Sequence, residues 1–317
     1  MNPRLVVSIS ILAAMASAAR ADHGKGSVGG RTISPRTLHE GDVSLDAGMR
    51  FQESETFSRA RLEEETLAGH DAHSADWFLE LSVGASYGMT DHLTLSASVP
   101  YVVIHGFIAG EENGTPPPDV LFSEADAIKG LGDASLLAKY SLLGDPVELA
   151  MLAGVKIPTG STRRKDDDGE VLEPDHQPGS GSWDALFGVA AGKQFERLWL
   201  GASLLVRITP EGRHEFKPGN TVQAAVKAEY QLTELGTFPR IYGFLELAGD
   251  VIAKDRVNGV SNDDTGGVIL SMAPGVKARL DDHVSGALSF PTPFYQGLHG
   301  FQHEERFGVL FGVSYDF

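Results

Sequence analysis

The stretch Phe307-Gly-Val-Leu-Phe-Gly-Val-Ser-Tyr-Asp-Phe317 alternates between large apolar residues and small or polar ones. Alternate residues of a β-strand point to opposite faces, so this stretch predicts a strand with one fully apolar, partly aromatic face. Such a face suits contact with lipid, and the opposite face suits the interior of a membrane barrel. A soluble edge strand would leave the same large side chains in water, and the lipid interpretation is therefore favoured.

Eleven further stretches show the same alternation, so the sequence predicts an all-β fold, an antiparallel transmembrane β-barrel of about 12 strands over residues 42–317. Each stretch is about ten residues long, enough to cross a bilayer when tilted. The expected strands are 43–51, 79–87, 93–101, 134–140, 147–157, 183–191, 198–208, 222–230, 241–251, 268–278, 284–290 and 307–317.

The connections between these strands alternate between short and long. Short periplasmic turns and long extracellular loops are typical of outer-membrane barrels, and an even number of strands then places both termini in the periplasm. Short helices are expected within 58–68 and 123–126. The short turns are 90–91, 143–146, 195–197, 233–239 and 281–282; the long loops are 52–76, 105–130, 158–182, 209–219, 253–265 and 291–305.

Residues 1–21 have the pattern of a cleaved signal peptide, which predicts export. Arg4 precedes an apolar core, and Ala19-Arg20-Ala21 forms a small-x-small cleavage site. The following residues 22–41 are Gly-rich and unpatterned. They form either a periplasmic plug that folds back into the barrel or a frayed terminus.

Composition narrows the classes of partner and chemistry. The chain has 317 residues, no Cys and a net charge of −17, which argues against nucleic acid or anionic lipid as a partner. No cofactor is indicated. Gly84-Ala-Ser-Tyr-Gly88 matches the G-x-S-x-G motif of hydrolases, but it lies inside an alternating strand and not at a strand–turn–helix elbow. We therefore expect no enzyme, and a membrane-embedded hydrolase is a remote alternative.

Charged residues occupy the expected inward positions of most strands. Nine acids and eight bases are nearly balanced, which favours ion pairs across the lumen over a strongly ion-selective pore. These pairs line a solute path, or they brace a closed barrel. The candidates are Arg50, Glu80, Lys139, Glu148, Lys156, Asp184, Arg207, Lys227, Glu229, Glu246, Lys277 and Arg306, with Asp46, Asp133, Asp250, Arg279 and Asp316.

Two further patterns concern binding. Small inward residues on the fourth to seventh strands, such as Gly154, Gly188 and Ala190, leave room for a solute, water or a plug. His70-x-x-His73 and His299-x-x-x-His303 have spacings that chelate zinc or copper on one helical turn, although solvated loop histidines are the simpler interpretation.

Four stretches together resemble the outer-membrane family named for the MetA pathway of phenol degradation. They are Tyr87-Gly-Met-Thr-Asp-His-Leu-Thr-Leu-Ser-Ala-Ser-Val-Pro-Tyr101, Gly130-Leu-Gly-Asp-Ala-Ser-Leu-Leu-Ala-Lys-Tyr140, Lys156-Ile-Pro-Thr-Gly160 and Pro178-Gly-Ser-Gly-Ser-Trp-Asp184. The resemblance implies a barrel that passes small, often aromatic or apolar, compounds, and it supplies no catalytic residues.

We therefore expect a passive outer-membrane channel. Its expected partners are a small solute, membrane lipid and lipopolysaccharide, and the barrel-assembly machinery through the C-terminal strand. The alternative is a closed structural barrel whose loops bind metal or a partner.

Overall fold

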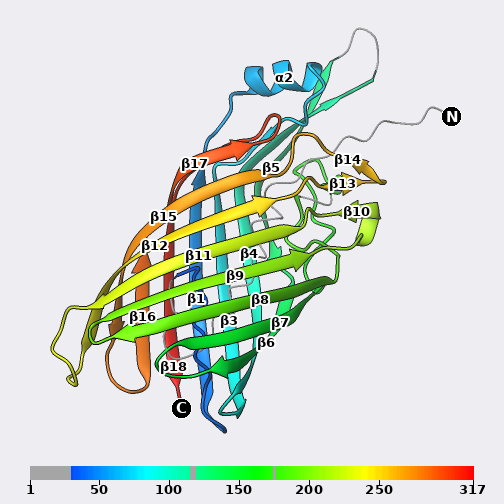
Figure 1. Ribbon diagram of the computed structural model, residues 1–317. Helices are drawn as coiled ribbons and strands as arrows, with labels where there is room; N and C mark the ends of the chain where they lie inside the picture. The colour runs from blue at the N-terminus through cyan, green and yellow to red at the C-terminus, as the bar shows by residue number, and fades with distance from the viewer. Residues whose placement is uncertain (1–29, 115–118, 174–175) are drawn as a thin grey trace.

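The computed structural model describes residues 30–114, 119–173 and 176–317. The predicted signal peptide, residues 1–21, and residues 22–29 lie outside the described residues. The predicted barrel is confirmed: twelve antiparallel strand positions close into one tall barrel, and pairing of β12 with β15 completes the circuit (Figure 1).

Two of the twelve wall positions are each shared by two successive strands. We call the end of the barrel with the short turns the turn end and the end with the long connections the loop end. β4 pairs with β6 near the turn end and with β5 near the loop end. β15 pairs in the same way with β16 and β17. The wall strands are β1 (Val43–Ser54), β3 (Trp77–Thr90), β4 (Leu93–Glu112), β5 (Val120–Leu131), β6 (Ala134–Leu143), β7 (Glu148–Ile157), β8 (Asp184–Phe195), β9 (Leu198–Ile208), β11 (Thr221–Gln231), β12 (Arg240–Ile252), β15 (Gly267–Arg279), β16 (Val284–Ser289), β17 (Thr292–Leu298) and β18 (Glu305–Asp316).

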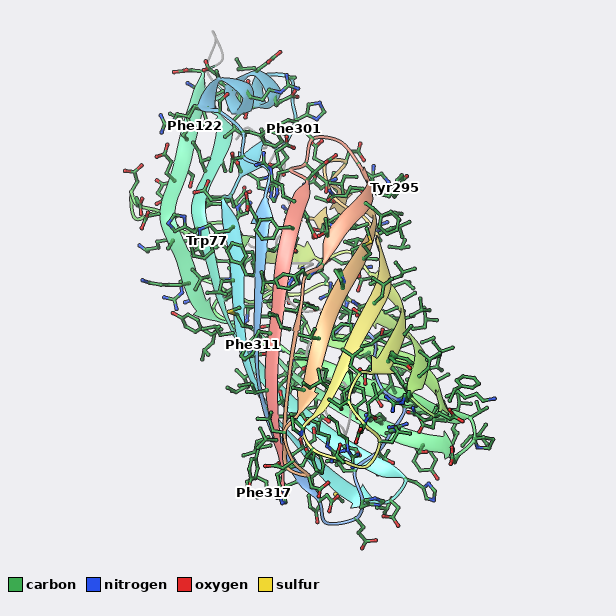
Figure 2. The ribbon with its side chains drawn as sticks, turned by 90° about the vertical axis from the view of Figure 1, so that its left-hand side faces the viewer. Trp77, Phe122, Tyr295, Phe301, Phe311 and Phe317 are labelled. Carbon is green, nitrogen blue, oxygen red and sulfur yellow. The ribbon has the colours of Figure 1, made fainter. Side chains whose placement is uncertain are left out.

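Exposure follows the predicted alternation along the strands. On β3, for example, Leu81 and Val83 are 45% and 64% exposed, whereas Glu80 and Ser86 are buried. Figure 2 shows the side chains around the outside of the barrel, with Phe317 at the turn end. The exposed apolar residues thus form the face that suits lipid. No helix among the described residues is long and apolar enough to span a membrane.

The long connections carry smaller elements at one end of the barrel. They are α2 (Arg59–Leu67), β2 (His73–Ser74), η2 (Arg213–Glu215), β10 (Phe216–Lys217), β13 (Arg256–Val257) and β14 (Val260–Ser261). Residues 52–76, 158–182, 209–219, 253–265 and 291–305 are called the loop cap below. The helix expected within 58–68 is confirmed, since Ser58 caps α2 by accepting a hydrogen bond from the Arg61 N–H.

The polar loop predicted over 105–130 is wrong. β4 and β5 continue through it as a hairpin that stands above the barrel wall, and the helix expected at 123–126 is part of β5 (Figure 1). Phe107, Ala125 and Ile128 are buried together with Leu172 from the loop cap. Burial of this apolar face against the loop cap stabilises the part of the hairpin that lies beyond the lipid-facing residues.

Candidate functional site

Residues 30–41 run along the inside of the barrel. The backbone N–H groups of Arg31 and Thr32 donate to the Glu246 carboxylate at 2.8 and 2.7 Å, in the middle of β12. The Leu38 N–H donates to Thr94 Oγ1 at 2.8 Å, near the turn end. These residues are therefore not a frayed terminus; they cross much of the lumen.

The middle of this segment meets an apolar part of the lumen wall. Ile33 packs with five inward residues, called the leucine patch below: Leu137, Leu152, Leu186, Ala190 and Leu205, on β6 to β9. A Cβ at Gly188 would lie 3.1 Å from side-chain carbons of both Leu152 and Leu205. The small residues therefore make room for leucines, and Ile33 occupies the space that remains.

Charged contacts fix the segment on both sides of Ile33. The Arg31 guanidinium contacts Asp250 at 2.5 Å, and Arg36 Nε lies 2.7 Å from Glu148 Oε1. Lys139 Nζ donates to the Ser34 carbonyl at 3.1 Å. Several of the predicted lumen residues thus bind the N-terminal segment.

A second group of lumen charges forms a network near the loop end. Lys156 Nζ lies 2.7 Å from Asp133 Oδ2 and 3.0 Å from Asp184 Oδ2. Arg207 Nε lies 4.0 Å from the same Asp184 oxygen. All four residues are buried, so each charge depends on the others for the interactions that it would otherwise make with water. We call these four residues the Lys156 network.

A third group lies toward the turn end. Glu229 contacts Lys277 directly, and its other oxygen lies 3.5 Å from Lys227 Nζ. The two ammonium groups also sit against aromatic rings, with Lys227 4.0 Å from the centre of Phe244 and Lys277 4.6 Å from that of Tyr242. This arrangement is typical of cations held in a partly apolar interior.

Among the remaining lumen candidates, Arg50 and Glu80 differ from Arg306. Arg50 and Glu80 face each other across the β1–β3 pair, and Arg50 lies over the Phe78 ring at 5.6 Å. The prediction for Arg306 is wrong: its side chain is 57% exposed and 3.8 Å from Glu53. A bulge shifts the β1–β18 register at this point, which takes Arg306 out of the lumen.

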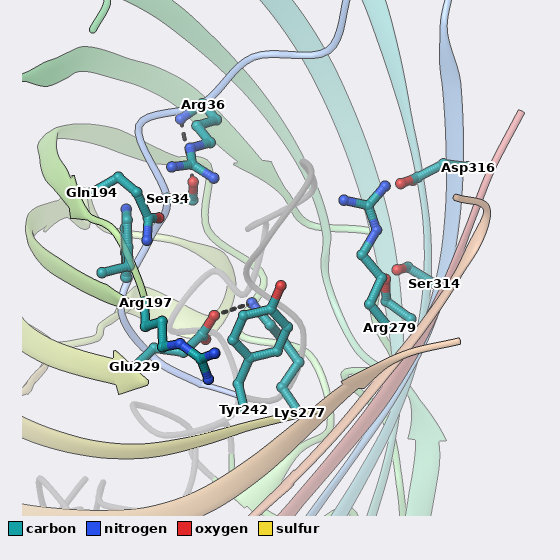
Figure 3. Close-up of a pocket in the computed structure, with 12 residues that line it drawn as sticks. Ser34, Arg36, Gln194, Arg197, Glu229, Tyr242, Lys277, Arg279, Ser314 and Asp316 are labelled. Atoms are coloured by element: carbon teal, nitrogen blue, oxygen red, sulfur yellow. Dashed lines mark hydrogen bonds and ion pairs between the residues drawn. The ribbon is translucent and has the colours of Figure 1, made fainter. Parts of the chain in front are cut away.

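A cavity of about 80 Å³ lies in the lumen toward the turn end. Ser34 and Arg36 of the N-terminal segment line it on one side, and Figure 3 shows Glu229, Tyr242 and Lys277 on another. Polar side chains from β8, β9, β15 and β18 complete the lining: Gln194, Trp199, Arg279, Ser314 and Asp316 are among them. The cavity is therefore bounded by the segment that crosses the lumen.

The histidine pairs predicted from spacing do not act as pairs. His70 Nδ1 lies 2.8 Å from Asp264 Oδ1, and His299 Nδ1 lies 3.2 Å from the Thr265 carbonyl oxygen. His73 and His303 instead meet His176, with the His73 ring centre 5.4 Å from that of His176 and 5.3 Å from that of His303. Sequence spacing missed His176 because its neighbours are about a hundred or more residues away.

Burial keeps these loop-cap groups uncharged. It lowers the pKa of His176 to about 3 and of His303 to about 4, and it lowers the pKa of His73 well below its usual range. Burial also raises the pKa of Asp255 to about 8, although the Gly219 N–H donates to its carboxyl.

Ser86 of the G-x-S-x-G match lies within β3. Its hydroxyl is buried and 2.9 Å from the Ser96 hydroxyl on β4. A nucleophile elbow requires a sharp turn into a helix, and β3 continues straight through this position.

Comparison with known proteins agrees with this barrel. Residues 60–317 match the family described as "Putative MetA-pathway of phenol degradation". The structure is similar to an outer membrane channel from Pseudomonas putida F1, with a TM-score of 0.58 and 14% identity over 89% of this chain and 97% of that one. The match shows a shared outer-membrane barrel fold. No curated protein matches the sequence.

More distant similarities are to two other barrels. The TodX deltaS2S3 mutant monoaromatic hydrocarbon channel has a TM-score of 0.48 and 13% identity over 89% of this chain and 92% of that one. The NanC porin has a TM-score of 0.46 and 8% identity over 86% and 98% of the two chains.

Proposed function

This chain belongs to the family described as "Putative MetA-pathway of phenol degradation", and on that premise we propose that it is an outer-membrane channel for a small apolar or aromatic solute. Residues 30–41 hold the channel closed and leave the lumen to open it. Both termini face the periplasm, and the barrel has no enzymatic activity.

The observation that carries this proposal is the place of Ile33. Ile33 is only 3% exposed and fills an apolar site within a lumen that is otherwise largely charged. A small apolar solute would gain the same burial on the leucine patch once Ile33 withdraws. The patch therefore supports an apolar solute over a sugar or an ion.

Release of the segment requires no broken covalent bond. Arg31–Asp250, Arg36–Glu148 and the hydrogen bonds to Glu246 hold it in place. These contacts join the segment to β12 and to β7. Loss of the segment leaves the interstrand hydrogen bonds of the wall intact, so the barrel stays folded.

The test is conductance and solute flux of refolded protein in planar bilayers and vesicles. A deletion of residues 22–38 should raise conductance and the uptake of a monoaromatic probe, with unchanged heat-modifiable migration on gels. Ile33→Ala is the matched point variant and should raise probe uptake less. A folded deletion variant with the low conductance and flux of the full chain would favour the alternative, a closed barrel whose loops bind a ligand.

Orientation has a separate test on whole cells. Cysteine in place of Asp167, in the loop cap, should react with an impermeant maleimide, whereas cysteine in place of Asp145, in a short turn, should not. Equal labelling at both positions would reject periplasmic termini.

The proposed membrane partners depend on the exposed face of the strands. Lipid and lipopolysaccharide contact this face, and β18 presents its aromatic residues to the barrel-assembly machinery. Deletion of Phe317, which is 64% exposed, should lower the amount of inserted protein in cells. Normal insertion of this variant would remove β18 as the contact with that machinery.

A further inference from the structure

Three loops that are far apart in the sequence bring imidazole rings together in the loop cap. His73 lies in β2, His176 in the connection between β7 and β8, and His303 just before β18. Their exposed fractions are 1%, 2% and 4%. Phe107 covers one side, with its ring centre 4.3 Å from that of His176. The three rings therefore form a buried cluster and not a solvated set of loop histidines.

Two rings of this cluster, His73 and His303, have few hydrogen-bond partners for their burial. Both nitrogens of His303 are buried and make no hydrogen bond among the described residues. The nitrogens of His73 have no partner of ordinary hydrogen-bond geometry there, although the Asp71 backbone is close enough to oppose the lowering of the His73 pKa by burial. Buried polar side-chain atoms nearly always have a partner, so two buried imidazoles with so few hydrogen bonds call for a specific explanation. Buried water does not explain this well, because a buried water needs several polar partners and Phe107 lies beside the rings of His73 and His176.

We propose that His73, His176 and His303 bind one divalent transition-metal ion, Zn²⁺ or Cu²⁺, which fastens three loops of the loop cap together. The ion would take one nitrogen from each ring. A water molecule or a small anion would complete its coordination.

The spacing of the rings fits this ion. Three imidazoles that each place a nitrogen 2.0–2.1 Å from one zinc ion have ring centres about 5 Å apart. The two measured separations are 5.4 and 5.3 Å. His73 is thus at the distance expected of a shared ion from both His176 and His303.

The rings must turn before they can coordinate an ion. In residues 30–114, 119–173 and 176–317, no three His, Cys, Asp or Glu side chains already have the arrangement of a metal site. Rotation about χ2 redirects the ring nitrogens while the ring centres move little, so the backbone can stay in place.

The experiment measures Zn²⁺ binding by full-length mature protein, refolded without a polyhistidine tag. Competition with a chromophoric chelator should give one Zn²⁺ per chain, and Zn²⁺ should raise the melting temperature. His303→Phe keeps an aromatic ring but removes a ligand. It should weaken binding by more than about a hundredfold, because loss of a hydrogen-bond partner of a metal-bound His already costs about 10–100-fold.

Two further variants keep the test decisive. His214→Asn is the matched control, since His214 is exposed in the loop cap at φ 60°, which Asn tolerates, and it should bind Zn²⁺ like the wild type. His303→Gln replaces His303→Phe if the latter does not show heat-modifiable migration. Equal Zn²⁺ affinity of the wild type and a folded His303 variant would overturn the proposal. The result does not depend on whether the barrel conducts.

Discussion

Asp184 in the lumen and Asp255 in the loop cap are equally buried, each 1% exposed, but they are held in different ways. Asp184 lies 3.0 Å from Lys156 Nζ and within 4.0 Å of Arg207. Asp255 accepts a hydrogen bond from the Gly219 N–H, and burial raises its pKa to about 8. The barrel interior thus buries Asp184 beside cations, whereas burial in the loop cap favours the neutral form of Asp255.

This difference reflects the rigidity of the two regions. Strand register fixes Lys156 opposite Asp184 on β7 and β8, so a buried pair keeps its geometry. The loop cap has few regular ladders to hold opposite charges together. Loss of charge is then the less costly way to bury a carboxyl or an imidazole.

Asp184→Ala should have the largest effect on stability, and it tests whether the buried charges of the lumen depend on one another. The substitution leaves Lys156 with one carboxylate of the network, Asp133, and removes the carboxylate that lies 4.0 Å from Arg207 Nε. We expect the free energy of unfolding to fall by about 3–5 kcal/mol, as for other buried pairs that lose one partner. Urea unfolding of the protein in lipid vesicles measures this change. A loss below about 1 kcal/mol would mean that the Lys156 network is not a set of coupled charges.

The pH dependence of stability tests the second half of the comparison, the neutral Asp255 of the loop cap. Its folded pKa of about 8 lies above the unfolded value of about 3.9, so the folded state binds the proton more tightly. The stabilisation is complete below about pH 4 and is lost as the pH rises toward 8, at about 1.4 kcal/mol per pH unit. Asp255→Asn, which stays neutral, should flatten the slope of stability between pH 6 and pH 8. An unchanged slope would contradict a neutral Asp255.

The smallest effect is expected for an exposed pair in the same loop. Lys254 Nζ lies 2.6 Å from Asp263, but the Asp263 side chain is 85% exposed. Water and salt screen such a pair, and the two side chains lose rotamer freedom when they meet. Asp263→Ala should therefore leave the urea midpoint unchanged within error. A clear shift would show that the loop cap also depends on paired charges.

Much of the barrel could be predicted because lipid imposes one rule on every strand. Alternation predicted inward positions for Lys156, Asp184 and Arg207, because a slip of one residue would move such charges into lipid, and all three are buried. The rule fails where lipid is not the neighbour. The β4–β5 hairpin continues beyond the expected strand because Phe107 packs on loop residues, and the bulge at Arg306 breaks the alternation locally.

The internal contacts were less accessible from sequence. Residues 30–41 have no alternation because side chains of the wall, such as Glu246 and Thr94, hold their backbone. His176 lies 103 residues after His73 and 127 before His303 in the numbering, so no local spacing joins them. Alternation along a strand predicts which face of that strand is buried, but it does not predict which loops contact one another.

Between the Lys156 network near the loop end and the contacts of Lys139 and Glu148 nearer the turn end, the leucine patch makes the lumen two-sided. Leu137, Leu152, Leu186 and Leu205 lie on β6 to β9, whereas Lys227, Glu229, Glu246 and Lys277 lie on β11, β12 and β15. A compound with an apolar ring and one polar substituent would travel with a fixed orientation, its ring against the leucines and its dipole toward the charges. Such a pore would select solutes first by how clearly each solute separates into an apolar part and a polar part, and only secondarily by size.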